Sequence, residues 1–230
     1  FKNISEIDIN NSFIFNSVPE STLDKSKLWQ HFQGVEIEVE KDIFDDEIIN
    51  LMDFNCDQRS SVHFFYTLPF TKNKALIETT WLSRFDNDSL KDYDSQIEKY
   101  IKETLGIHKY KINFKEKGAI PLFYSRSTKK VNKINIGSAG CMTRLSTGYT
   151  FLNIQEHSKY IRENIENIAS AKNFTIGKKY ELLDNIFLNV LKKHPERMPD
   201  IYLEMFKSKA SIFIKFLSNK SNAYEDLLII

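Results

Sequence analysis

The sequence of 230 residues contains only two cysteines, Cys56 and Cys141, which lie far apart and outside any Cys-x-x-Cys pair. This scarcity argues against a disulfide framework or a cysteine-based zinc site, and it fits a reducing compartment. No apolar run approaches the roughly 20 residues that a membrane-spanning helix needs, and no signal peptide is recognisable. Glycine is scarce as well, with 7 residues, and no predicted strand leads into a Gly-x-Gly-x-x-Gly dinucleotide-binding fingerprint.

An excess of charge of one sign is also missing. The 32 Lys and Arg residues balance 31 Asp and Glu residues, for a net charge of +1. Such a balance provides no bulk attraction for nucleic acid, so we expect no nucleic-acid partner. What the sequence does contain is apolar material, with 41% hydrophobic and 13% aromatic residues. A chain of this composition can bury a sizeable core.

Strand patterns dominate up to about residue 150. Val35, Ile37 and Val39 alternate with glutamates, which is typical of a half-buried strand. Further strands are predicted at residues 12–17, 62–66, 75–82 and 110–115, with a connection at 68–74 and a turn at Gly118. One helix interrupts them, with Tyr93, Ile97, Tyr100 and Ile101 on one face.

After residue 150 the apolar period changes to that of helices, including one predicted over residues 201–217. Strands followed by helices predict an α+β fold, with a mainly antiparallel sheet and a C-terminal helical region. We place the boundary between them at residue 155, giving parts 1–155 and 156–230. The chain starts at Phe1 and ends within an apolar pattern, so we expect it to be a piece of a longer protein.

Glu78 is the first candidate for chemistry. It lies inside a strongly apolar predicted strand, on the same face as Leu76, Thr80 and Leu82. A carboxyl group beside apolar surface loses solvation, so its pKa rises and it becomes a usable general acid near neutral pH. The alternative is an exposed glutamate on the polar face of an edge strand.

A glycine-containing segment at residues 135–151 is the second candidate. Gly137 and Gly140, followed by Thr147 and Gly148, come between a short apolar run and a helical stretch. Glycines let backbone N–H groups approach an anion or a flat ring, and a helix start adds free donors. The alternative is a strand–turn–helix corner whose glycines serve only the turn.

Two further segments contain candidate substrate-lining residues. In one, Glu116 precedes a Gly–Pro bend that ends at Pro121. In the other, His31 and Phe32 belong to an aromatic segment that could line an apolar channel. A buried turn without chemistry and a structural histidine are the alternatives. No Ser/His/Asp order and no histidine pair at metal spacing occurs, so we expect no metal site.

Taken together, these segments resemble the flavin-dependent lycopene cyclase family in content and in order. The matching pieces are residues 12–17, 30–34 (QHFQG), 51–54 (LMDF), 65–70 followed by 75–80 (ALIETT), 116–122 (EKGAIPL) and 137–151. Each piece alone is weak, but their common order is specific. The resemblance covers roughly residues 12 to 155 and continues weakly through the helices.

The resemblance implies a larger two-domain FAD enzyme that closes β-rings at the ψ-end groups of lycopene and related linear carotenoids. It implies reduced FAD as cofactor and NAD(P)H as reductant, with Gly137, Gly140, Thr147 and Gly148 near the flavin. Glu78 matches the family's acidic residue and is the expected catalytic acid/base. Where some relatives have a second acidic residue, this chain has Thr79, which leaves one carboxyl group in that segment.

The missing dinucleotide fingerprint departs from the family pattern, and it implies that this piece alone is inactive. We expect a cytoplasmic enzyme with peripheral membrane contact, because the substrate resides in lipid. Two alternatives stay open. One is another flavoprotein of the geranylgeranyl reductase or aromatic hydroxylase class, and the other is a non-catalytic carotenoid- or lipid-binding module, which would not need Glu78.

Overall fold

The computed structural model describes residues 12–19, 24–124, 132–171 and 174–229. The chain divides into two compact units that alternate along the sequence. We call them the sheet unit (Lys25–Pro121 and Val190–Tyr202) and the helical unit (Phe1–Asp24, Leu122–Asn189 and Leu203–Ile230). This division follows packing, whereas the boundary expected at residue 155 follows the change of secondary structure.

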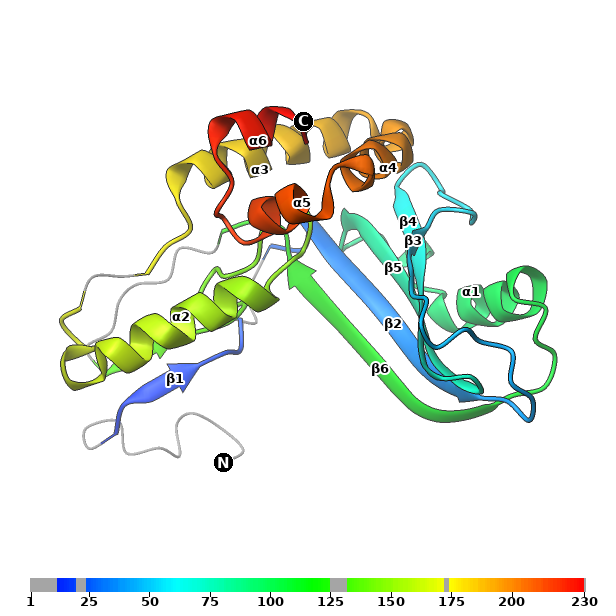
Figure 1. Cartoon of the computed structure of the whole chain (residues 1–230). Coiled ribbons are helices and arrows are strands. Elements are labelled where there is room, and N and C mark those ends of the chain that lie inside the picture. Colours follow the sequence, from blue (N-terminus) through cyan, green and yellow to red (C-terminus); the bar gives the residue numbers. More distant parts are fainter. Residues whose placement is uncertain (1–11, 20–23, 125–131, 172–173, 230) are drawn as a thin grey trace. The chain divides into compact units, whose positions relative to one another are not determined.

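The sheet unit is built on five antiparallel strands in the order β3-β4-β5-β2-β6. Figure 1 shows β5, β2 and β6 as long neighbouring strands. The strands are β2 (Leu28–Glu38), β3 (Asn50–Asp53), β4 (Val62–Thr71), β5 (Lys74–Arg84) and β6 (Lys111–Pro121). The 3-10 turns η2 (Asp88–Leu90) and η5 (Pro195–Arg197) also belong to this unit, as does α1 (Tyr93–Lys99), which continues as the π-helical turn η3 (Tyr100–Thr104).

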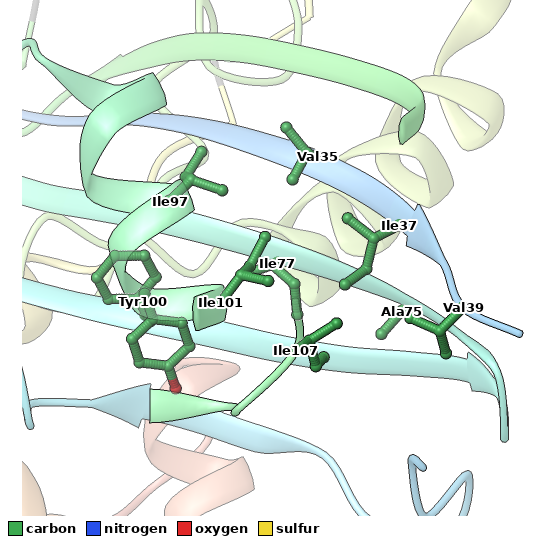
Figure 2. Close-up of a cluster of buried hydrophobic side chains, with 10 residues drawn as sticks. Val35, Ile37, Val39, Ala75, Ile77, Ile97, Tyr100, Ile101 and Ile107 are labelled. Carbon is green, nitrogen blue, oxygen red and sulfur yellow. The ribbon is translucent and has the colours of Figure 1, made fainter. Parts of the chain in front are cut away.

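The core of the sheet unit lies between one face of the sheet and the α1–η3 segment (Figure 2). The predicted alternation is confirmed, because Val35 and Ile37 are buried on this face while the intervening Glu36 is half-buried. The predicted helix is confirmed as well. Tyr100 stacks on Phe65 with ring centroids 3.9 Å apart and an interplanar angle of 1°. Burial of these apolar side chains is the main stabilising contribution in this unit.

Two predicted turns are placed differently. The connection expected at residues 68–74 shrinks to Lys72 and Asn73, because β4 runs on through Pro69 to Thr71. Pairing with β3 reaches only Thr67, so the missing N–H of Pro69 breaks no ladder with that strand. The turn predicted at Gly118 is wrong, since β6 continues through it to Pro121.

The helical unit contains a short parallel pair of strands and most of the helices. The strands are β1 (Ile14–Asn16) and β7 (Lys133–Asn135). The helices are α2 (Phe151–Glu163), α3 (Lys178–Lys193), α4 (Met198–Lys207), α5 (Ala210–Leu217) and α6 (Ala223–Leu227), with the 3-10 turn η4 (Ile165–Asn167). The unit boundary passes through α3 and α4.

The single helix predicted over residues 201–217 is two helices, because α4 ends at Lys207 and α5 begins at Ala210. Lys209, between them, has an extended backbone conformation. The α+β fold class with an antiparallel sheet is confirmed. Among the described helices, none has the length and apolarity needed to cross a membrane.

Candidate functional site

Four residues form one row across the sheet of the sheet unit. Gly34 on β2 pairs with Glu78 on β5 and with Glu116 on β6, and Glu78 in turn pairs with Tyr66 on β4. Directly paired residues of antiparallel strands point to the same face of a sheet. Tyr66, Glu78 and Glu116 therefore share one face, opposite the face that packs on α1. We call this face the acid face.

Glu78 is half-buried on the acid face. The pKa of its carboxyl group is raised to about 7, mainly by loss of solvation; the hydrogen bond from Thr80 acts in the opposite direction, and the charge of Glu116 adds to the increase. The Thr80 hydroxyl donates to Oε1 of Glu78 over 2.8 Å. A carboxyl group with this pKa keeps a large protonated fraction at neutral pH, which suits a general acid.

The surroundings of Glu78 on the acid face are mainly apolar. Leu76 precedes it by two residues on β5 and faces Leu68 on β4. Phe32 pairs with Thr80 on one side and with Gly118 on the other, so its ring lies on the same face. Phe114, opposite Glu36, is 56% exposed. An exposed apolar surface around a weakly acidic carboxyl group can accept a hydrocarbon, and the carboxyl group can donate a proton to it.

Aromatic side chains close one end of the acid face. Tyr66 packs edge-on against Phe64, with centroids 5.2 Å apart. Tyr202, on α4, is buried and stacks on Phe54 with centroids 5.9 Å apart. Burial raises the pKa of Tyr66, and the charge of Glu78 raises it further, so this phenol stays neutral. The row of Tyr66, Glu78, Gly34 and Glu116 therefore has a neutral aromatic residue at its β4 end.

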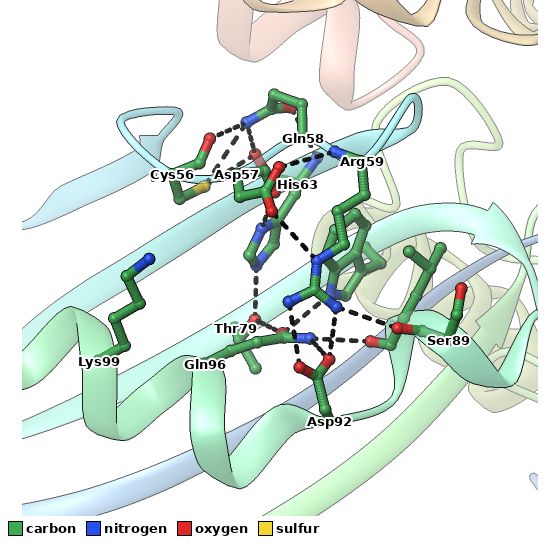
Figure 3. Close-up of polar contacts among 12 residues, drawn as sticks. Cys56, Asp57, Gln58, Arg59, His63, Thr79, Ser89, Asp92, Gln96 and Lys99 are labelled. Carbon is green, nitrogen blue, oxygen red and sulfur yellow. Dashed lines mark hydrogen bonds and ion pairs between the residues drawn. The ribbon is translucent and has the colours of Figure 1, made fainter.

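Thr79 points away from Glu78, into the opposite face. It is fully buried, its hydroxyl lies 2.7 Å from Nε2 of His63, and it donates to Gln96 over 2.8 Å (Figure 3). Trp81 donates to the same Gln96 oxygen over 3.0 Å. The expectation of a single carboxyl group holds for the strand segment but not for the acid face. There the second carboxyl group comes from Glu116 on another strand.

His31 also lies on the helix-covered face and not beside Glu78. It is completely buried, with Nδ1 2.6 Å from the Tyr93 hydroxyl and Nε2 2.7 Å from the Ser83 hydroxyl. Burial, followed by the charge of Lys91, lowers the pKa of His31 to about 4, so the ring is neutral at pH 7. Pro121 pairs with Trp29 at the end of β6, which places it on the same face as His31. Of the four proposed lining residues, Phe32 and Glu116 lie on the same face as Glu78, whereas His31 and Pro121 lie on the opposite face.

The glycine-containing turn belongs to the helical unit and connects β7 to α2. Gly137 and Gly148 have left-handed backbones, with φ of 56° and 70°. A Cβ on Gly140 would lie 2.6 Å from the carbonyl oxygen of Asn135, which leaves no room for a side chain. Thr147 accepts a hydrogen bond from the N–H of Tyr149 over 3.3 Å. The glycines at these three positions are therefore required by backbone geometry or by close approach.

This turn fits a group that accepts hydrogen bonds from the backbone. The N–H groups of Ser138 and Ala139 donate no hydrogen bond within the described residues, and Ala139 is only 4% exposed. Unpaired buried N–H groups are rare in folded proteins. A flavin ring with its carbonyl oxygens matches such donors, so the residues present are compatible with the expected cofactor.

A buried ion pair that the sequence did not indicate holds the turn in place. Arg144 and Asp184 are both completely buried and 2.8 Å apart. Asp184 also accepts from the Leu145 N–H and the Ser146 hydroxyl. Arg144 donates to the carbonyl oxygen of Phe216 on α5. The only sequence signal is a single arginine between Thr143 and Leu145, which is too common a pattern to identify such a pair.

Comparison with solved structures finds the same fold in a geranylgeranyl bacteriochlorophyll reductase-like protein from Thermoplasma acidophilum. The TM-score is 0.53 at 12% identity, and the match covers 91% of this chain and 56% of that protein. The chain therefore spans about half the length of this relative. VirX1 in its apo form matches with a TM-score of 0.35 and 14% identity over 93% of this chain and 36% of its own, which is too low for an argument. Comparison with curated proteins gives no match.

Comparison with protein-family models is more specific. The model described as lycopene cyclase protein matches residues 5–219. That range includes the whole row from Gly34 to Glu116 and the glycine-containing turn. The family assignment agrees with the ordered motifs of the sequence and with the fold. The chain therefore belongs to the lycopene cyclase family.

Proposed function

We propose that the full-length protein is a lycopene β-cyclase that closes the ψ-end groups of lycopene without net redox change. The observation that carries this proposal is Glu78. It is a half-buried carboxyl group with a pKa of about 7 on the apolar acid face, in a member of the lycopene cyclase family. Lycopene offers only carbon–carbon double bonds, so a cyclase needs a Brønsted acid next to apolar surface.

Glu78 is the proton donor and acceptor in this proposal. Its carboxyl proton moves to a carbon of the terminal double bond and leaves a carbocation. A second double bond attacks this cation, which forms the ring bond and moves the charge to a ring carbon. A proton lost from the neighbouring carbon to the Glu78 carboxylate forms the ring double bond. The proton count is restored, and product and substrate have the same mass.

Once the hydrocarbon covers them, the apolar neighbours of Glu78 exclude water from the reacting carbons. A carbocation next to water would be hydrated instead of cyclised, and the surface formed by Phe32, Leu76 and Phe114 offers no nucleophile. The Thr80 hydroxyl, which donates to Oε1, fixes the orientation of the carboxyl group. It also lowers the cost of the carboxylate that forms after proton transfer.

We propose FAD as the cofactor, held in part by the turn that contains Gly137, Gly140, Thr147 and Gly148. The unpaired N–H groups of Ser138 and Ala139 support this assignment. A bound reduced flavin supplies negative charge that stabilises a cationic transition state. NAD(P)H is the proposed reductant. Because the substrate resides in lipid, we also propose that the enzyme is cytoplasmic and peripheral to the membrane.

The fold shared with a geranylgeranyl reductase-like protein makes reduction the competing activity. Mass separates the classes, because cyclisation leaves the mass of lycopene unchanged, whereas reduction adds hydrogen and hydroxylation adds oxygen. A carotenoid-binding module would leave lycopene unaltered and would tolerate loss of Glu78.

The test uses the full-length protein in a bacterial host that accumulates lycopene. We expect β-carotene in pigment extracts, and we expect Glu78→Gln to abolish it, because the amide keeps the shape but has no acidic proton. Glu98→Gln, at an exposed position on α1, is the matched control and should leave the yield unchanged. Persistent lycopene with the unaltered protein contradicts the function, and an unchanged yield in Glu78→Gln contradicts the role of the acid.

A further inference from the structure

Gly34 leaves a gap between the carboxyl groups of Glu78 and Glu116 on the acid face. It pairs with Glu78 on one side and with Glu116 on the other, so it stands between them in the row. Its backbone is not left-handed, so conformation alone does not require glycine here. The absence of a side chain at this position therefore matters for the space that it leaves to neighbouring side chains.

Glu116 fills the space that a side chain of Gly34 would take. A Cβ on Gly34 would lie 3.1 Å from Oε1 of Glu116 and 3.2 Å from its Cγ. Leu76 closes the same space from β5, with its Cδ1 3.1 Å from the Cβ position. The carboxyl group of Glu116 therefore leans over β2, toward the strand that contains Glu78.

No cation neutralises the two acids within the described residues. Neither Glu78 nor Glu116 has a lysine, arginine or histidine within ion-pair distance there. The lysines that flank Glu116 alternate to the other face, where Lys115 pairs with Asp94 over 3.1 Å and Lys117 lies over the Tyr93 ring.

The remaining groups near Glu78 on the acid face do not supply positive charge either. Tyr66, from β4, is neutral, and Thr80 gives only a hydroxyl hydrogen bond. Further along the same face, Nζ of Lys74 lies 3.7 Å from Oε1 of Glu36, so the charge of Lys74 is already paired. Two carboxyl groups on one face without a counter-ion disfavour double ionisation, so the charge of Glu116 adds to loss of solvation in favouring the protonated form of Glu78.

We propose that Glu116 is a positioning residue for the acid: across the gap left by Gly34, its carboxylate keeps a single proton on Glu78. The use of this proton in catalysis rests on the proposed cyclase function. The electrostatic interaction between Glu116 and Glu78 does not depend on that function. When Glu78 gives up its proton to the substrate, both groups are negative and repel each other. That repulsion favours the return of a proton to Glu78 from the ring carbon, which closes the cycle with no net change.

The direct test is a titration of Glu78 in the full-length protein without lycopene. Glutamate labelled with ¹³C at the side-chain carboxyl group is followed by NMR, and the Glu78 signal is assigned by its loss in Glu78→Gln. We expect Glu116→Gln to lower the apparent pKa of Glu78 by at least about half a unit, since a neighbouring negative charge is removed. Glu116→Asp, which keeps the charge, should retain most of the elevation.

Glu36→Gln is the matched control. It removes a carboxylate from the same face, but one that already pairs with Lys74, so the Glu78 titration should stay in place. If Glu116→Gln fails to fold, Glu116→Ala replaces it. This variant also removes the negative charge, so it should lower the apparent pKa of Glu78 as well.

The pH profile of β-carotene formation gives a second readout. Its alkaline limb should move to lower pH in Glu116→Gln by the same shift as the titration. A Glu78 titration that is identical in the unaltered protein and in the folded Glu116→Gln or Glu116→Ala variant would overturn the proposal. A lowered pKa of Glu78 in a protein that makes no β-carotene would instead sustain the pairing and contradict the cyclase function.

Discussion

The ring of Phe32 occupies the place of a side chain on Gly118, its partner across β2 and β6. A Cβ on Gly118 would lie 2.5 Å from Cζ of Phe32, well inside contact distance. Glycine at this position is thus a packing partner of an aromatic residue and not a turn. The arrangement gives the acid face a flat aromatic surface two residues from Gly34.

This contact predicts strong coupling between the two positions. Gly118→Ala should force the Phe32 ring out of place and destabilise the protein by about 1 kcal/mol or more. In a Phe32→Ala background the same change should cost much less, because the clash is gone. Urea unfolding of the two single variants and the double variant measures the coupling. Equal costs of Gly118→Ala in both backgrounds would show that the ring does not fill this space.

The buried pair of Arg144 and Asp184 predicts a large loss of stability in the helical unit. Arg144→Leu leaves Asp184 buried without a cation, so we expect a loss of about 3–5 kcal/mol in the free energy of unfolding. The control is Lys220→Ala, which removes an exposed partner of Glu156 and should cost about 0–1 kcal/mol. Similar small losses in both variants would contradict a structural role of the pair.

His31 predicts a loss of stability on acidification. Burial lowers its pKa in the folded protein to about 4, whereas the pKa of an unperturbed histidine is 6.5. Between these values the unfolded chain binds more protons, so stability falls as the pH drops from 6.5 to about 4, by at most about 3 kcal/mol from this residue. Urea unfolding at several pH values should show a smaller slope in His31→Gln. His108→Gln, at an exposed position, should leave the slope unchanged.

Glu78 predicts the opposite trend. Its pKa rises from 4.5 to about 7 on folding. The stability that the protonated carboxyl group contributes to the folded protein is therefore fully present below pH 4.5 and is lost as the pH rises through 7. Glu78→Gln, which can still accept the Thr80 hydrogen bond, should therefore stabilise the protein at pH 8 by about 1–3 kcal/mol. At pH 4 the two proteins should be nearly equal in stability. A glutamine variant that is less stable at pH 8 would mean that the carboxylate is well solvated.

Much of the sheet unit could be predicted from the sequence because its side chains alternate strictly. Val35 and Ile37 identified the core face, and the position of Glu78 between Leu76 and Thr80 identified its own face. The sequence could not show that Glu116 joins Glu78, since that depends on the register of β6 against β2. His31 was misleading for a related reason, because one residue of shift along a strand exchanges the two faces.

The order of the chain within the sheet unit has a consequence for synthesis on the ribosome. Phe54 stacks on Tyr202, and residues Val190–Tyr202 belong to the same compact unit as the strands. The five strands are complete at Pro121, long before that segment is made. The aromatic end of the acid face therefore stays uncovered while the rest of the chain emerges. A nascent chain stalled before Tyr202 should expose Phe54 to chaperones and proteases, and one stalled well beyond it should not.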